Sequence, residues 1–138
     1  MTIPPKLIGD FAVIDDPKEG YVILKPKEQI QSGMSWTKQG YPFYSGTATY
    51  SRKVNFDAID KQVWVEVDEI ADMVEFIINS KTASIRPWAP YSCEISSLIK
   101  SGENTIALKV TNSMKNFLEG ETKPSGLLSS FYIKISNK

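Results

Sequence analysis

The stretch GTATYSRKVNF at residues 46–56 decides the fold class, because its side chains alternate with a period of two. The residues on one face of such a strand would be Ala48, Tyr50, Arg52, Val54 and Phe56, and the residues between them are polar. Successive side chains of a strand point to opposite faces, so only the first set can face a core. The stretch therefore predicts a β-strand with one buried face.

Period-two alternation recurs through most of the chain and predicts a protein built mainly from strands. Strands are expected at 63–68, 73–79, 105–110 and 131–135, with shorter edge strands at 11–15 and 21–25. Helical spacing appears in ISSLIKSG at 95–102 and SMKNFL at 113–118, neither long enough for a parallel crossover. The richest loops are expected at 26–45, 80–92 and 119–126. This pattern predicts an all-β, antiparallel jelly-roll β-sandwich with no helix longer than about three turns.

Length and composition fit one globular domain at residues 1–138. The chain is 41% hydrophobic and 23% charged, and a single core commonly serves about 100 to 200 residues. Sixteen basic and sixteen acidic residues leave no net charge, so neither a nucleic acid nor an anionic membrane is an expected partner. No stretch approaches the ~18 apolar residues of a membrane span, and MTIPPKLIG at 1–9 lacks a targeting signal.

The sequence contains no histidine, which excludes several chemistries. Ser-His-Asp and Cys-His nucleophiles, His-ligated zinc and the usual neutral-pH general base all need this residue. Catalysis would have to use carboxylates, Lys or Tyr. Cys93 is the one cysteine, so no intrachain disulfide can form, and it is expected to be a small buried hydrophobic side chain.

Two acidic residues could form a catalytic pair, because glycosidases use two carboxylates about 5 to 10 Å apart. Candidates crowd one predicted hairpin: Glu66, Asp68, Glu69, Asp72 and Glu75. Exposed acids are the norm, so we interpret them as solvated strand faces and turns, with no catalytic residue among them. No Asp-x-Asp-x-Asp spacing marks a metal site. The expectation is no cofactor, with a structural calcium ion as the alternative.

Several motifs recur in a fixed order along residues 33–138. They are SGTATYSRKVNF at 45–56, the segment from VEFIIN to NFL at 74–118, and PSGLL at 124–128. Their order and spacing resemble the galactose-binding-like domain called the sugar-binding domain of family 2 glycoside hydrolases. The chain is also similar to accessory modules of α-L-rhamnosidase-type enzymes. The matching positions are Gly46, Tyr50, Val54, Phe76, Ile78, Asn79, Pro90, Tyr91, Gly102 and Asn104.

One position departs from that family pattern: Asn79-Ser80 stands where Asn-Gly is usual. Because Asn-Gly favours a tight type I′ turn, this turn is less strongly predicted here.

The resemblance implies a non-catalytic accessory module of a larger glycoside hydrolase, with the catalytic domain as partner and carbohydrate as a second candidate. It also suggests an extracellular or periplasmic location. Two alternatives stay open, a free-standing carbohydrate-binding module and a protein-interaction domain on the same scaffold, since a fold does not fix a function.

Aromatic residues in loops are the best candidates for a binding site, because aromatic faces stack on sugar rings. The candidate carbohydrate-binding residues are Trp36, Tyr41, Tyr44, Trp88, Tyr91 and Arg86. The alternative is that they cover the ends of the sandwich. Trp36 is expected to be exposed in its polar loop, whereas Trp88 and Tyr91, set between prolines and a strand, are expected to be packed.

Two further residues lie on predicted strands. Trp64 alternates with Val63 and Val65, so it points away from them and is either core from a second sheet or an exposed anchor. Arg52 is expected to be partly buried and paired with a carboxylate rather than to clamp a ligand.

Overall fold

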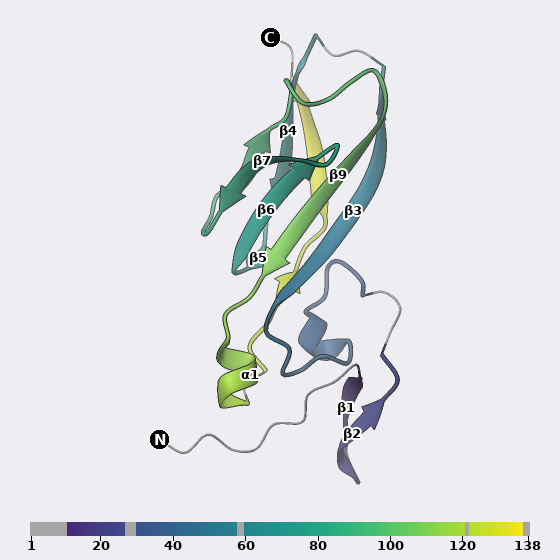
Figure 1. The fold of residues 1–138 in the computed structure, drawn as a ribbon, viewed down its shortest axis with the longest axis vertical. Coiled ribbons are helices and arrows are strands. Elements are labelled where there is room, and N and C mark those ends of the chain that lie inside the picture. The colour runs from purple at the N-terminus through teal and green to yellow at the C-terminus, as the bar shows by residue number, and fades with distance from the viewer. Residues whose placement is uncertain (1–10, 27–29, 58–59, 121, 137–138) are drawn as a thin grey trace.

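A computed structural model describes residues 11–26, 30–57, 60–120 and 122–136. Two antiparallel sheets face each other (Figure 1). The first has the strand order β3-β9-β6-β7, formed by Thr47–Phe56, Gly102–Thr111, Met73–Ile78 and Lys81–Arg86. The second has the order β11-β4-β8, formed by Phe131–Ser136, Gln62–Val67 and Tyr91–Glu94. The prediction of an all-β sandwich is confirmed.

The core lies between the two sheets, where the period-two alternation places it. Val63, Val65 and Val67 of β4 are buried, and so are the residues that face them from β6 and β9. Those residues are Val74, Phe76, Ile78, Ile106, Leu108 and Val110. Burying one such side chain stabilises the fold by roughly 1.5 to 3 kcal/mol.

Smaller elements complete the fold. β1 (Ala12–Asp16) and β2 (Gly20–Leu24) pair with each other, and so do β5 (Ile70–Ala71) and β10 (Gly126–Leu127). The helices of the described residues are a 3-10 turn, η1 (Trp36–Lys38), and α1 (Lys115–Glu119). The prediction of short helices only is therefore confirmed for the described part of the chain. β1 and β2 are strands as predicted, but they form a separate hairpin and are not edges of the main sheets.

Two local predictions were wrong. The segment 80–92 was expected to be loop, yet it contains all of β7 and the first residues of β8, where the period-two signal is weak. No helix forms at 95–102; a turn with a hydrogen bond from Leu98 N to Ile95 O stands there, and Gly102 begins β9. The side chain of Asn104 competes for the local backbone, since it binds both the N–H and the carbonyl of Lys100.

The two-residue turn between β6 and β7 forms despite the departure at Ser80. Asn79 and Ser80 both have positive φ, 50° and 69°, as a type I′ turn requires. The Asn79 amide donates to Leu98 O at 3.1 Å and to Asn104 Oδ1 at 2.9 Å, and its oxygen accepts from Thr105 N at 2.9 Å. These bonds stabilise the turn although Ser80, and not glycine, adopts the positive φ that glycine accommodates more easily.

The strand directions give the sandwich two different ends (Figure 1). We call one the turn end; it consists of residues 57, 60–61, 79–80 and 95–101. We call the other the loop end; it consists of the β1–β2 hairpin, residues 30–46, the β7–β8 connection at 87–90, and residues 112–120 and 122–127, which include α1. Most of the predicted site residues lie at the loop end.

Candidate functional site

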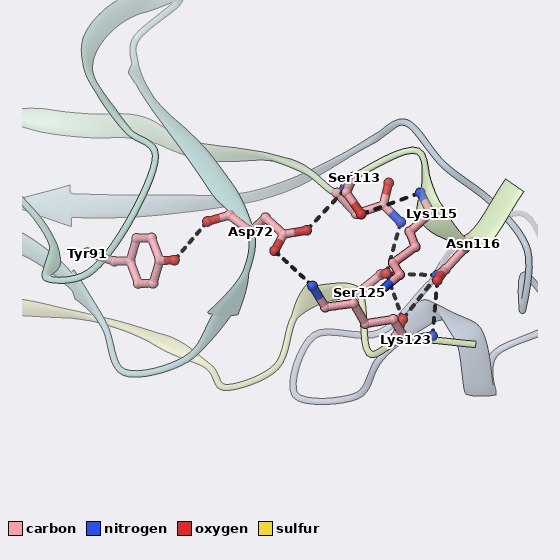
Figure 2. A network of polar contacts seen from close by, with 8 residues as sticks. Asp72, Tyr91, Ser113, Lys115, Asn116, Lys123 and Ser125 are labelled. Carbon is pink, nitrogen blue, oxygen red and sulfur yellow. Dashed lines mark hydrogen bonds and ion pairs between the residues drawn. The ribbon is translucent and has the colours of Figure 1, made fainter. Parts of the chain in front are cut away.

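Asp72 joins three segments at the loop end (Figure 2). Its carboxylate accepts a hydrogen bond from Ser113 N at 3.0 Å and pairs with Lys123 Nζ at 3.8 Å. Its carbonyl accepts from the Tyr91 hydroxyl at 2.7 Å. The side chains of Asp72 and Lys123 are 40% and 50% exposed, so this ion pair is a hydrated surface feature.

Beside this ion pair lies a buried polar cluster (Figure 2). The Asn116 amide donates to Lys123 O at 3.0 Å and to Ser125 Oγ at 3.2 Å, and its oxygen accepts from Lys123 N at 3.0 Å. Asn112 also donates to Ser125 Oγ, at 2.9 Å. Asn116 and Ser125 are each 1% exposed, and every buried side-chain nitrogen or oxygen of the described residues has a partner. The cluster is therefore structural: it fixes the loops without leaving a group for a ligand.

Trp36 was expected to be exposed, and that prediction is wrong: the side chain is 1% exposed. Its backbone N–H donates to Ser125 O at 3.0 Å and its indole N–H to Tyr44 O at 3.3 Å. Gly126 gives it room, because a Cβ there would lie 2.9 Å from the Trp36 ring and 2.6 Å from the Tyr50 hydroxyl. The Trp36 side chain therefore packs against β10 and holds the loop at 33–46 on the sandwich.

The side chain of Gln39 helps this loop to be buried, because it pairs with backbone groups of the loop. Its amide donates to Met34 O at 2.8 Å and to Gln31 O at 3.0 Å, and its oxygen accepts from Gln31 N at 2.6 Å. A buried loop normally leaves backbone groups unpaired, which was the reason for expecting Trp36 outside. Here one glutamine supplies the missing partners.

Tyr44 lies next to Trp36, and Tyr41 lies next to Tyr44, but the planes of these rings are inclined to one another and do not form a flat platform. The Trp36 and Tyr44 rings meet at 61° with centroids 5.3 Å apart, and Tyr41 and Tyr44 meet at 66° and 6.4 Å. Tyr44 is 42% exposed, and its hydroxyl bridges the N–H and carbonyl of Thr47. Edge-to-face rings support one another, whereas a sugar platform needs coplanar faces.

The second group of predicted residues lies where the chain crosses from β7 to β8. Trp88 was expected to be packed, and this prediction is wrong: it is 73% exposed. β7 ends at Arg86 and β8 begins at Tyr91, so Trp88 lies on a four-residue connection outside both sheets. Arg86 is exposed opposite Val74 of β6. Tyr91 is half-buried as expected, and burial raises the pKa of its hydroxyl.

The remaining predicted residues have structural contacts. Arg52 is exposed rather than buried, and its guanidinium lies 4.2 Å from the centre of the Phe131 ring, closing the edge of the core by a cation–π contact. Among the described residues, the partner of Arg52 is this aromatic ring and not the expected carboxylate. A groove of about 460 Å³ runs beside it, lined by Ile30, Ser32, Ala48, Thr49, Tyr50, Ser51, Arg52 and Phe131.

Trp64 and Cys93 belong to the three-stranded sheet. Trp64 lies half-buried on the outer face, opposite Lys134 and Glu94, so it is not core from the second sheet. Cys93 is buried as predicted, and burial raises the pKa of its thiol.

The acidic residues do not converge on a site in the described part of the chain. Glu66 faces Tyr132 across the outer face of the same sheet, and the Tyr132 hydroxyl donates to Asp68 Oδ1 at 3.4 Å. The carboxylates of Glu66 and Asp68 raise the pKa of the tyrosine. No three His, Cys, Asp or Glu side chains among the described residues gather as a metal site. In those residues, no helix is long and apolar enough to cross a membrane.

Sequence reasoning identified the loop end but missed its polar cluster. Asn112, Asn116 and Ser125 lie within the segments at 74–118 and 124–128, but none was singled out as a site residue, and their partners lie up to 68 residues away. Only the fold reveals these contacts.

Comparisons with known proteins give relatives for the fold. No protein-family model matches the sequence. A protein of Formosa agariphila described as a putative beta-glucuronidase is 29% identical over 125 residues, which are 87% of this chain and 11% of that protein. A rhamnosidase from Novosphingobium sp. PP1Y shares the fold over 98% of this chain and 15% of its own, with a TM-score of 0.66 and 20% identity.

A family 2 glycosyl hydrolase from Bacteroides cellulosilyticus also shares the fold. The match covers 92% of this chain and 20% of that enzyme, with a TM-score of 0.57 and 20% identity. The resemblance seen in the sequence is confirmed: the chain has the β-sandwich fold found as a small part of family 2 and rhamnosidase-type enzymes. It spans between about a tenth and a fifth of the lengths of these relatives.

Proposed function

We propose that residues 1–138 are one non-catalytic accessory module of a larger glycoside hydrolase, in which they support the catalytic domain. The observation that carries this proposal is the coverage: nearly the whole chain matches glycoside hydrolases, yet it spans only 11% of the beta-glucuronidase relative and 15% of the rhamnosidase. A segment that small leaves the rest of such an enzyme to supply the catalytic residues.

The chemistry of the described residues supports the non-catalytic part of the proposal. Glycoside hydrolysis needs an acid and a base or nucleophile poised across the bond. Asp72 instead pairs with Lys123, and Asp68 accepts from the Tyr132 hydroxyl at 3.4 Å. The sequence also contains no histidine, the side chain that most often serves as a neutral-pH base.

We also propose that the module contacts carbohydrate, and the exposed ring of Trp88 favours this proposal. Trp88 is the most exposed of the large apolar side chains described, and exposed Arg86 lies two residues before it. A flat indole beside a guanidinium can stack on a sugar ring and bind its hydroxyls. The edge-on rings of Trp36, Tyr41 and Tyr44 support a packed surface at that loop instead.

Two measurements test the proposal. An immunoblot of source cells with an antibody against these residues should show a protein several times larger than 15.5 kDa. The purified 138-residue chain should release no aglycone from a panel of aryl glycosides. A native band at the mass of the chain alone, or turnover that is lost in Asp72→Asn or Glu66→Gln, would contradict the module hypothesis.

A further inference from the structure

The β1–β2 hairpin is a two-stranded element outside both sheets of the sandwich (Figure 1). Two of its contacts tie it to the module: Val13 N donates to Gly40 O at 2.6 Å, and the Tyr21 ring meets the Phe43 ring edge-on at 5.1 Å. An isolated two-stranded hairpin is at best marginally stable in water. The hairpin therefore depends on what packs against it.

Both faces of this hairpin carry exposed apolar side chains. Residues opposite one another in an antiparallel pair share a face, and Ile14 pairs with Val22 while Ala12 pairs with Leu24. Ile14 and Leu24 on this face are 40% and 45% exposed. On the other face Val13 pairs with Ile23 and Asp15 with Tyr21, and Ile23 and Tyr21 are 53% and 55% exposed.

A strand pair at a water surface normally alternates apolar and polar faces, so apolar side chains on both faces indicate burial on both sides. The module itself covers only part of this surface. The tip of the hairpin is different: it is polar, and Asp16 accepts hydrogen bonds from Lys18 N and Glu19 N at 2.8 and 2.9 Å. Apolar flanks with a polar rim are the composition of a protein–protein contact.

Exposed apolar side chains are concentrated toward the loop end, and the hairpin carries four of them. Among the described residues, nine of the twelve exposed large apolar side chains lie at the loop end: Ile14, Tyr21, Ile23, Leu24, Met34, Tyr44, Trp88, Met114 and Leu118. Concentration at one end of the molecule marks an interaction surface more strongly than scattered exposure does.

The comparisons indicate what lies beyond this surface. The fold match to the rhamnosidase covers 98% of this chain and 15% of that enzyme. In that enzyme the matched region is followed or preceded by the other 85% of the chain. A large protein body is thus available to cover an element that this module leaves half-exposed.

We propose that the β1–β2 hairpin is the docking arm of the module, packed between the sandwich and the catalytic domain of the same larger chain. This inference rests on the proposed function. It places Ile14 and Ile23, one from each face of the hairpin, inside the contact between the domains, and it leaves the turn end in solvent.

Hydrogen–deuterium exchange of the larger chain and of the 138-residue chain tests the proposal. Amides of residues 12–24 should exchange on the order of tenfold more slowly in the larger chain, because docking suppresses local opening. Amides at Asn79 and Ser80 of the turn end should exchange equally in both chains. Ile14→Ser and Ile23→Ser should each abolish the added protection of the hairpin.

Ile135→Ser is the matched control, because Ile135 is also a strand isoleucine and is 52% exposed, close to the 53% of Ile23. It lies opposite Val63 at the start of β4, toward the turn end, and it should leave the protection of the hairpin unchanged. In the isolated 138-residue chain, all three variants should melt within a few degrees of the unsubstituted protein, which shows that each still folds.

The possible failures are distinguishable. Protection that appears elsewhere on the module but not at residues 12–24 would overturn the docking arm and leave the accessory-module proposal standing. No added protection at any residue of the module would overturn both. Concentration-dependent protection of the hairpin in the isolated chain would make a second copy the occupant and overturn the inference.

Discussion

The two ends of the sandwich both close the core, but the exposed side chains are mainly polar at one end and include many apolar ones at the other. At the turn end, Asn104 is 1% exposed and binds Lys100 and Gly102, while the residues around it are exposed and polar. They include Asp57, Asp60, Lys61, Ser80, Lys81, Lys100 and Glu103. At the loop end, an equally satisfied cluster around Asn116 and Ser125 is surrounded by exposed apolar side chains.

This difference shows that the pairing of buried polar groups at an end of the sandwich does not determine whether the exposed surface there is polar or apolar. Both ends satisfy their buried polar groups, so both are built to hold one conformation. The surface around Asn104 at the turn end is polar, whereas the loop end exposes large apolar side chains of the kind that mark interaction sites. The asymmetry is what we expect of a module attached at one end.

The largest expected effect separates the two tryptophans of the loop end. Trp36→Ala removes a ring that is 1% exposed and should lower the free energy of unfolding by about 3 to 5 kcal/mol. Trp88→Ala removes a ring that is 73% exposed and should change it by no more than about 0.5 kcal/mol. Urea denaturation of both variants measures this contrast. Equal losses for the two variants would mean that the loop end is packed differently.

The turn end is expected to depend on a single amide. Asn104→Ala deletes both the acceptor of Lys100 N and the donor to Lys100 O, each within 2.8 Å. Each buried group left unpaired costs roughly 1 to 3 kcal/mol, so thermal denaturation should show a clear loss. Asn55→Ala, an exposed asparagine on β3, is the control and should be nearly neutral. A neutral Asn104→Ala would show that water replaces the amide.

The smallest expected effect is that of two surface ion pairs in the described part of the chain, one near each end. Lys123→Ala removes the partner of Asp72 and Lys53→Ala that of Glu103, 3.8 and 3.7 Å apart respectively. Exposed pairs contribute about 0 to 1 kcal/mol and are screened by salt. Both variants should melt within a few degrees of the unsubstituted protein, with differences that shrink in 1 M NaCl. A salt-independent loss for Lys123→Ala alone would indicate that Asp72 is buried when the protein folds.

The sequence by itself determined most of the strands and the core, although not β7 and β8. Period-two alternation is a local property, and it correctly predicted β3, β4, β6, β9 and β11 with Val63, Val65 and Val67 inward. The order of its motifs also predicted the sandwich that the comparisons show. These predictions succeeded because the side chains of a strand alternate between its two faces, so neighbouring residues alone show which face is apolar.

The tertiary structure alone decided which loop residues are buried. Trp36 is inside because Ser125, Gly126 and Gln39 meet it there, and the first two lie about ninety residues away in the chain. Trp88 is outside because the β7–β8 connection carries it past the edge of both sheets. Burial of a loop side chain depends on partners brought by distant segments, and no local pattern of residues encodes those partners.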